Sequence, residues 1–221
     1  MLELSILKSD SEVEAIMTMS EKQIEALGFT EHSKRHASIV SKWSGDILRA
    51  LGKSDKCVRL AEIAGYLHDI GNCINRKDHA QTGAILAYQI LKRLGLDYSE
   101  ASEVMMAIGN HDEQYGVPVS EVSAALILAD KADVHKSRVK NNVTNVSLAN
   151  IHDRVNLAAE RSFITVDRAG AVITLHIEID TAICPVIDYF EIYFNRMKLC
   201  RRAAEFLSCR FSLIINGVTL L

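Results

Sequence analysis

The chain contains a histidine followed directly by an aspartate, His68-Asp69, where an apolar run ends just before Ile70-Gly71. Neighbouring residues on a helix point about 100° apart, so such a pair can bind one ion only where the helix ends and the chain begins to turn. The same pair recurs at 111–112 and 152–153, so a single occurrence carries little weight. The case for metal chemistry therefore depends on what surrounds the first pair.

Four histidines and two aspartates fall at the ends, or on the apolar faces, of successive predicted helices. They are His36, His68, Asp69, His79, His111 and Asp130. Each histidine has an ordinary alternative, as a core residue or, for His79, as an exposed residue of a first turn. A buried aspartate such as Asp130 is costly unless it is paired or binds a metal. Imidazole and carboxylate ligands suit borderline divalent ions, and six ligands predict a centre of two ions that share a carboxylate. The identity of these ions stays open among Fe, Mn, Zn, Co, Ni and Mg.

Hydrophobic periodicity predicts that a bundle of helices carries these residues. The predicted helices cover a stretch that ends at 27, then 31–51, 54–69, 79–94, 99–111 and a last one that begins at 120. The expected N-caps are Ser54, Asp78, Ser99 and Ser120. Small residues around Gly65 predict that another helix, or a ligand, approaches His68 closely, and Asp133 and Arg138 are expected to form an ion pair.

Beyond residue 140 the sequence changes character. A polar linker at 141–145 and a helix at 148–161 precede a predicted antiparallel hairpin over 162–179, in which β-branched residues alternate with polar ones. A long helix from Pro185 to about Ser208 and a closing strand over 211–220, interrupted at 216–217, complete the chain. The expected fold class is mainly α, with a helical bundle at 1–140 and a smaller C-terminal α+β segment at 141–221. Because strands need pairing partners, that segment is a candidate dimerisation element and the chain a candidate homodimer.

Composition narrows the classes of function. The 221 residues are 48% hydrophobic and 24% charged, and the net charge of −3 argues against binding nucleic acid by bulk charge. No apolar run reaches the roughly 18 residues of a membrane span, and the N-terminus has no signal-peptide layout. The five cysteines form no CxxC motif, which indicates reduced thiols. We therefore expect a cytoplasmic protein with a small-molecule partner.

The order H…HD…H…H…D of these residues resembles the HD-domain metal-dependent phosphohydrolase superfamily. The flanks Leu67-His68-Asp69-Ile70-Gly71 and Ala129-Asp130-Lys131 match it as well. The resemblance covers about residues 28–138, and it implies an HD-type helical domain that binds divalent metal ions. The form with two middle histidines is similar to the two-metal branches, which include dinucleoside polyphosphate hydrolases and the cyclic-di-GMP phosphodiesterases called HD-GYP proteins.

The sequence departs from these branches in two places. HD-GYP proteins usually show two adjacent histidines and a Gly-Tyr-Pro tail, whereas residues 110–118 read Asn-His-Asp-Glu-Gln-Tyr-Gly-Val-Pro. Many relatives carry a lysine after His-Asp-Ile-Gly, and this chain has Asn72. The first departure argues against cyclic-di-GMP, and the second removes one positive charge near the site.

The resemblance implies a mechanism in which His36, His68, Asp69 and Asp130 hold one ion and Asp69, His79 and His111 hold the other. Asp69 would bridge the two ions, and Asp69 and His68 are the expected catalytic residues. Two ions would acidify a water between them, so that a hydroxide attacks phosphorus. The expected reaction is hydrolysis of a phosphoester, mono- or diester, in a nucleotide or related small phosphorylated metabolite.

Candidate contacts to the substrate phosphate are Lys131, Arg76 and Lys77, for which a solvated surface charge is an equally strong alternative. The alternative function is a non-catalytic metal- or nucleotide-binding sensor or regulatory module. A third hypothesis is a helical scaffold for dimerisation with incidental histidines, which predicts no bound metal.

Overall fold

The computed structural model describes residues 2–27, 34–139 and 151–221. Two helices open the chain, α1 (Leu4–Lys8) and α2 (Ser11–Ala26). Asp10 is the N-cap of α2, because its carboxylate accepts hydrogen bonds from the backbone N–H groups of Glu12 and Val13. The α2 helix packs against the segment that follows His68-Asp69, so it supports the region of the candidate site.

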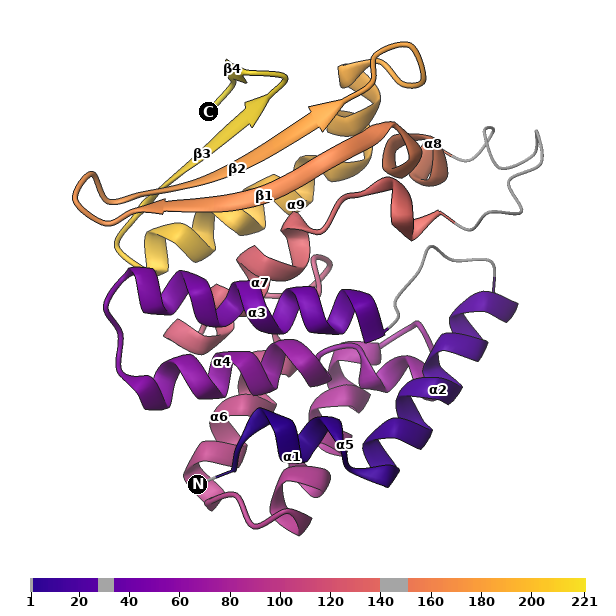
Figure 1. The fold of residues 1–221 in the computed structure, drawn as a ribbon, viewed down its shortest axis with the longest axis vertical. Helices are drawn as coiled ribbons and strands as arrows, with labels where there is room; N and C mark the ends of the chain where they lie inside the picture. The colour runs from indigo at the N-terminus through magenta and orange to yellow at the C-terminus, as the bar shows by residue number, and fades with distance from the viewer. Residues whose placement is uncertain (1, 28–33, 140–150) are drawn as a thin grey trace.

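Five further helices form the bundle that the periodicity predicts. They are α3 (Lys34–Ala50), α4 (Asp55–Leu67), α5 (His79–Arg93), α6 (Tyr98–Gly109) and α7 (Glu121–Ala132). Figure 1 shows α3 and α4 lying side by side, and Gly65 explains how closely they approach. A Cβ atom at Gly65 would lie 2.7 Å from Cα of Ser41 in α3. The predicted close approach of a second helix near His68 is thus confirmed, and α3 is that helix.

Two of the four predicted N-caps are confirmed, at Ser54 and Ser120, whose side chains accept backbone hydrogen bonds at the starts of α4 and α7. The cap of α6 is Asp97 and not Ser99, because the helix begins at Tyr98, two residues earlier than a Ser99 cap implies, and Asp97 accepts from the N–H of Ser99 at 2.8 Å. Asp78 precedes α5 but makes no side-chain cap bond, since its φ of 59° places it in the left-handed region. Between α4 and α5, the predicted polar loop contains a short 3-10 helix, η1 (Ile70–Cys73).

The C-terminal segment is a small mixed sheet packed against one long helix. Its elements are α8 (Ile151–Ala158), β1 (Ala159–Asp167), β2 (Val172–Ile179), α9 (Val186–Phe206), β3 (Arg210–Ile215) and β4 (Val218–Thr219). The strand order is β1-β2-β3-β4, with β1–β2 and β3–β4 antiparallel and β2–β3 parallel. The parallel pair is joined through α9, as such a crossover requires. The mainly α fold with a C-terminal α+β segment is confirmed.

Two boundaries in this segment differ from the prediction. The helix predicted to reach residue 161 ends at Ala158, because residues from Ala159 onward pair with β2 instead. The predicted interruption of the last strand is a turn at Asn216–Gly217, both with positive φ, that separates β3 from β4. Strand β1 lies at one edge of the sheet, and the homodimer stays a prediction.

One apolar core joins both parts of the chain. The inner face of β2, with Ile173, Leu175 and Ile177, belongs to the same buried cluster as the helices of the bundle. Figure 1 shows the sheet at one end of the molecule with α9 running across one of its faces, and α9 also packs against α7. The predicted linker at 141–145 and the predicted boundary between 140 and 141 lie outside the described residues. In the described ranges, every helix is too short or too polar to cross a membrane.

Candidate metal centre

The fold brings the six predicted ligands to one place. His36 lies in the first turn of α3, His68 and Asp69 follow the last residue of α4, and His79 is the first residue of α5. His111 follows α6 by two residues and Asp130 lies in the last turn of α7. None of the six is more than 8% exposed. Helix ends suit this purpose because the chain turns there and releases consecutive side chains toward one point.

The four imidazoles are held in the same way, through Nδ1. For three of them the acceptor is the backbone carbonyl of the residue three positions earlier. These bonds run from His68 to Gly65 (2.9 Å), from His79 to Arg76 (3.0 Å) and from His111 to Ile108 (2.6 Å). A carbonyl can only accept, so Nδ1 carries a proton in all three rings, and Nε2 is the nitrogen turned toward the site. This is how metal-binding histidines are usually oriented.

The fourth imidazole, His36, has a carboxylate partner that the sequence analysis missed. Its Nδ1 lies 2.7 Å from Oδ2 of Asp133, which Arg35 also contacts at 3.2 Å. Burial would raise the pKa of Asp133, but the contact with His36 and the nearby guanidinium groups hold that pKa below its usual range. Arg138, the predicted partner, donates to the backbone carbonyl of Asp133 at 2.8 Å. The available signal was the spacing, because Asp133 follows Asp130 by three residues.

Three of the side chains have the spacing of ligands to a single ion. Nε2 of His36 lies 3.2 Å from Nε2 of His68 and 3.3 Å from Oδ1 of Asp130. Nε2 of His68 lies 3.5 Å from the same carboxylate oxygen. Ligands about 2.1 Å from a tetrahedral ion are about 3.4 Å from one another. The donor set of two imidazoles and a carboxylate therefore fits a borderline divalent ion both in chemistry and in spacing.

Asp69 extends the site toward the other two histidines. Its Oδ2 lies 3.3 Å from Nε2 of His68 and 3.7 Å from Nε2 of His36, whereas its Oδ1 lies 3.4 Å from Nε2 of His79. The ring of His111 lies 5.0 Å from that of His68 and 5.1 Å from that of His79, centroid to centroid. His68, Asp69 and His111 form a second group that could hold a metal. The predicted ligands of the second ion are Asp69, His79 and His111, so this group differs from them only in containing His68 in place of His79. The four side chains lie close to one another.

The imidazoles of the site differ in the direction in which their pKa values are shifted. Burial lowers the pKa of His79, and burial together with the neighbouring His68 and Lys131 lowers the pKa of His111 well below its ordinary value. Both rings are therefore neutral near pH 7 and offer a lone pair. Burial also acts to lower the pKa of His68, but Asp69 and Asp130 outweigh it and raise that pKa to about 10. The two carboxylates thus create a place where positive charge is stabilised.

The three candidate phosphate contacts have different settings. Lys131 is only 5% exposed, and its amino group contacts Oδ2 of Asp130, the oxygen that faces away from the histidines. Arg76 places Nη1 at 3.3 Å from Oδ1 of Asn72 and 3.6 Å from Oδ1 of Asp69. Arg76 and Lys77 line an open pocket of about 450 Å³ beside His79. These two cations therefore face a space large enough for a ligand, whereas Lys131 lies inside the protein against a candidate ligand.

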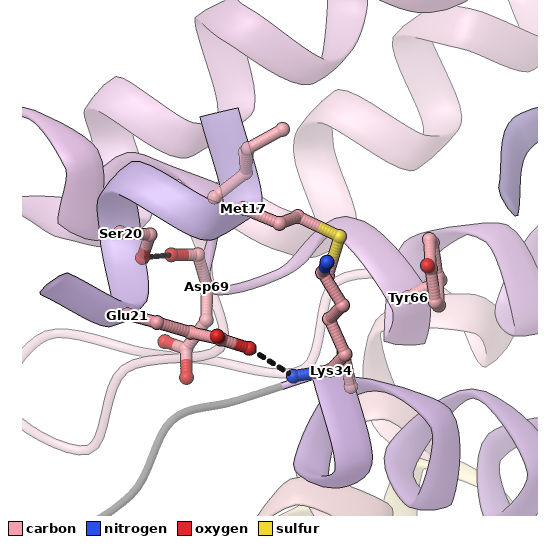
Figure 2. Close-up of a pocket in the computed structure, with 8 residues that line it drawn as sticks. Met17, Ser20, Glu21, Lys34, Tyr66 and Asp69 are labelled. Atoms are coloured by element: carbon pink, nitrogen blue, oxygen red, sulfur yellow. Dashed lines mark hydrogen bonds between the residues drawn. The ribbon is translucent and has the colours of Figure 1, made fainter. Parts of the chain in front are cut away.

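Figure 2 shows how α2 braces the segment that carries Asp69. Ser20 Oγ donates to the backbone carbonyl of Asp69 at 3.5 Å, and Glu21 accepts from the backbone N–H of Lys34 at 2.8 Å. The hollow between them, about 10 Å³, is far too small for a substrate. This region is a structural support for the site, and of these two pockets the one beside His79 has room for a ligand.

Comparison with known proteins places part of this chain in a family. The family model for the HD domain matches residues 29–136. The chain is 29% identical over 134 residues to uncharacterized protein MJ1020 of Methanocaldococcus jannaschii, and the match covers 51% of each protein. The chain thus spans about half the length of that relative. A predicted HD superfamily hydrolase from an uncultured Thermotogales bacterium, solved as a crystal structure, is 24% identical, covers 61% of this chain and 75% of its own, and has a TM-score of 0.45.

Residues 29–136 are therefore an HD domain, as the resemblance of the sequence implied. All six candidate ligands fall within this segment. The helix α2, the sheet and the helix α9 lie outside it.

Proposed function

We propose that this protein is a metal-dependent phosphohydrolase that cleaves a phosphoester bond in a small phosphorylated molecule. The observation that carries the proposal is the position of Asp69, whose two carboxylate oxygens face different histidines. One oxygen lies near His68 and His36, and the other lies near His79. A carboxylate shared in this way is what two neighbouring ions require of a bridging ligand.

In the proposed centre, one ion would be held by four side chains and the other by three, with Asp69 common to both. The first set is His36, His68, Asp69 and Asp130, and the second is Asp69, His79 and His111. When bound, divalent ions supply Lewis-acid charge that acidifies water and offsets the charge that develops on a phosphoryl group. The residues of the chain keep each Nε2 turned inward, through their Nδ1 partners, and exclude bulk water from the ligands.

The pocket beside His79 is the proposed place of the substrate. Arg76 is held at its inner end by Asn72 and Asp69, and Lys77 adds a second cation. A guanidinium group suits a phosphate because its N–H groups match two phosphate oxygens at once. Tyr115, which is 66% exposed, also lines the pocket and offers an aromatic face to a planar base. A nucleotide satisfies both features.

Metal analysis and turnover test this proposal together. Protein purified without a metal-affinity tag would be analysed for metal by mass spectrometry. It would then be assayed with bis(p-nitrophenyl) phosphate and p-nitrophenyl phosphate, before and after chelation and re-addition of Mn²⁺. We expect about two ions per chain and turnover that chelation removes and Mn²⁺ restores.

A matched pair of variants provides the control. His36→Ala should lose metal and turnover, whereas His176→Ala, in the sheet, should keep both. Bound metal without turnover of either ester would instead support a sensor or binding module. Protein that binds no metal, even with added Mn²⁺ or Fe²⁺, would contradict both functions.

A further inference from the structure

A charged contact links the C-terminal helix α9 to the loop that follows His111. Nε of Arg196, in α9, lies 3.3 Å from Oε2 of Glu113. The Arg196 side chain is only 16% exposed, and its guanidinium lies 4.0 Å above the ring of Tyr193. Arg196 is therefore held both by stacking and by charge, so it offers Glu113 a fixed partner.

The Glu113–Arg196 contact is electrostatically coupled to a second charged contact, which includes a candidate metal ligand. Asp130 contacts Lys131. Burial acts to raise the pKa of Glu113, but Arg196 and Lys131 outweigh it and lower that pKa. Asp130 and Glu113 in turn help to raise the pKa of Arg196. The Asp130–Lys131 contact in the HD domain and the Glu113–Arg196 contact with a helix outside it therefore influence each other electrostatically.

Glu113 lies close enough to His111 in the chain for its contact with Arg196 to affect the position of this imidazole. His111 lies just beyond the end of α6, and its Nδ1 bond to Ile108 ties it to the helix on one side only. On the other side the chain continues as a loop with a tight turn, in which Gly116 donates to the carbonyl of Asp112 at 2.6 Å. Glu113 is two residues after His111, so a fixed Glu113 restrains the backbone that carries this imidazole.

We propose that Arg196 is a positioning residue of the metal centre, which fixes Glu113 and thereby the imidazole of His111. The C-terminal segment then completes the ion site nearer to His79 and His111 and is more than an appendage of the HD domain. This inference rests on the proposed function, since it assigns His111 to a metal.

Positioning and simple charge predict opposite results when Arg196 is removed. A guanidinium near a cation site repels the cation, so loss of its charge alone would tighten metal binding. Loss of a positioning contact would instead weaken metal binding, because the imidazole of His111 would spend less time in the orientation that binds the ion. The direction of the change therefore identifies the role.

The binding experiment titrates metal-free protein with Mn²⁺ and counts ions and affinities by electron paramagnetic resonance. Arg196→Met should weaken the Mn²⁺ affinity of the site that contains His111 about tenfold, which corresponds to about 1.4 kcal/mol. The affinity of the site that contains His36 should not change. Arg196→Lys should recover part of the affinity, and Glu113→Gln should reproduce the defect. Arg201→Met removes an exposed arginine of the same helix and should bind Mn²⁺ as the wild type does. Unchanged or tighter binding in Arg196→Met would overturn the proposal.

Nuclear magnetic resonance of the metal-free protein separates this proposal from the proposed function. The imidazole ¹⁵N resonances of His111 should shift in Arg196→Met, and less in Arg196→Lys, whether or not the site binds metal. A shift in a protein that never binds Mn²⁺ would show that Arg196 positions His111, but it would contradict the phosphohydrolase and, with it, the metal centre. Unchanged His111 resonances in both variants would overturn the positioning role and leave the phosphohydrolase standing.

Discussion

The HD domain and the C-terminal sheet differ in which partner the Nε2 atom of a histidine faces. In the HD domain, His68 gives Nδ1 to the carbonyl of Gly65 and turns Nε2 toward other ligands. In the sheet, His176 places Nε2 at 2.9 Å from Oγ1 of Thr165 and stacks on Phe163 at 4.5 Å. The first ring turns Nε2 toward the other candidate ligands, and the second uses Nε2 to join two strands. Residue type alone does not define a ligand, because the direction of Nε2 decides.

The His-Asp pairs show the same difference. His68-Asp69 is buried at the end of α4, whereas His152-Asp153 lies in the first turn of α8 with an exposed histidine. A short pair of residues therefore has chemical meaning only where helix ends and buried neighbours converge. The four predictions below test this contrast between the two parts of the chain.

The largest effect is expected from the shared carboxylate. Asp69→Ala removes the oxygens that face both groups of histidines, so bound metal should be lost and turnover should fall at least about a thousandfold. Metal analysis and the phosphodiester assay measure both. Asp153→Ala, in the other His-Asp pair, should leave metal content and turnover unchanged. A fully active Asp69→Ala protein would contradict the proposed site.

A smaller effect is expected from the carboxylate that orients His36. Asp133→Asn replaces the charged partner of Nδ1 with a neutral one, so the imidazole becomes a weaker and less well-oriented ligand. Loss of such partners lowers metal affinity by roughly 10- to 100-fold, which a Mn²⁺ titration would measure. The matched variant is Asp188→Asn, which weakens the Arg154–Asp188 pair (2.8 Å) beside the sheet. Equal affinity in the two variants would mean that Asp133 has no role at the centre.

Arg76 tests the substrate side of the site. Arg76→Met keeps the length of the side chain but removes the cation beside Asp69, so KM for bis(p-nitrophenyl) phosphate should rise about tenfold with a smaller change in kcat. Arg161→Met, on the edge strand β1, should change neither constant. Steady-state kinetics at fixed metal concentration measure both. A KM for Arg76→Met equal to that of the wild type would mean that Arg76 does not contribute to substrate binding.

The smallest effect is expected at a helix cap. Ser120→Ala removes the side-chain acceptor at the start of α7, the helix that carries Asp130, and should cost about 1 kcal/mol. For a chain of this size the midpoint of thermal unfolding should fall by about 2–4 °C. Ser99→Ala is the comparison, because Asp97 caps α6 and remains in place. A larger loss from Ser99→Ala would mean that the cap of α6 is assigned to the wrong residue.

The helices of the HD domain and the order of the six candidate ligands could be predicted from local patterns in the sequence. Apolar residues recur every three or four positions wherever a helix buries one face, and cap residues such as Ser54 act within a few positions, so both leave local signals. The hairpin at the start of the sheet is local in the same sense, since its two strands are adjacent in the chain.

The groups that orient and surround those candidate ligands follow from tertiary packing and could not be predicted from the sequence. The bond from His36 to Asp133 joins residues 97 positions apart, and the contact from Arg196 to Glu113 joins residues 83 positions apart. Local periodicity cannot encode such pairs, because they depend on how whole helices pack. The same packing turns the two oxygens of Asp69 toward different histidines. The ligands could therefore be found along the chain, but the direction of each donor atom follows from the packing of helices distant in sequence.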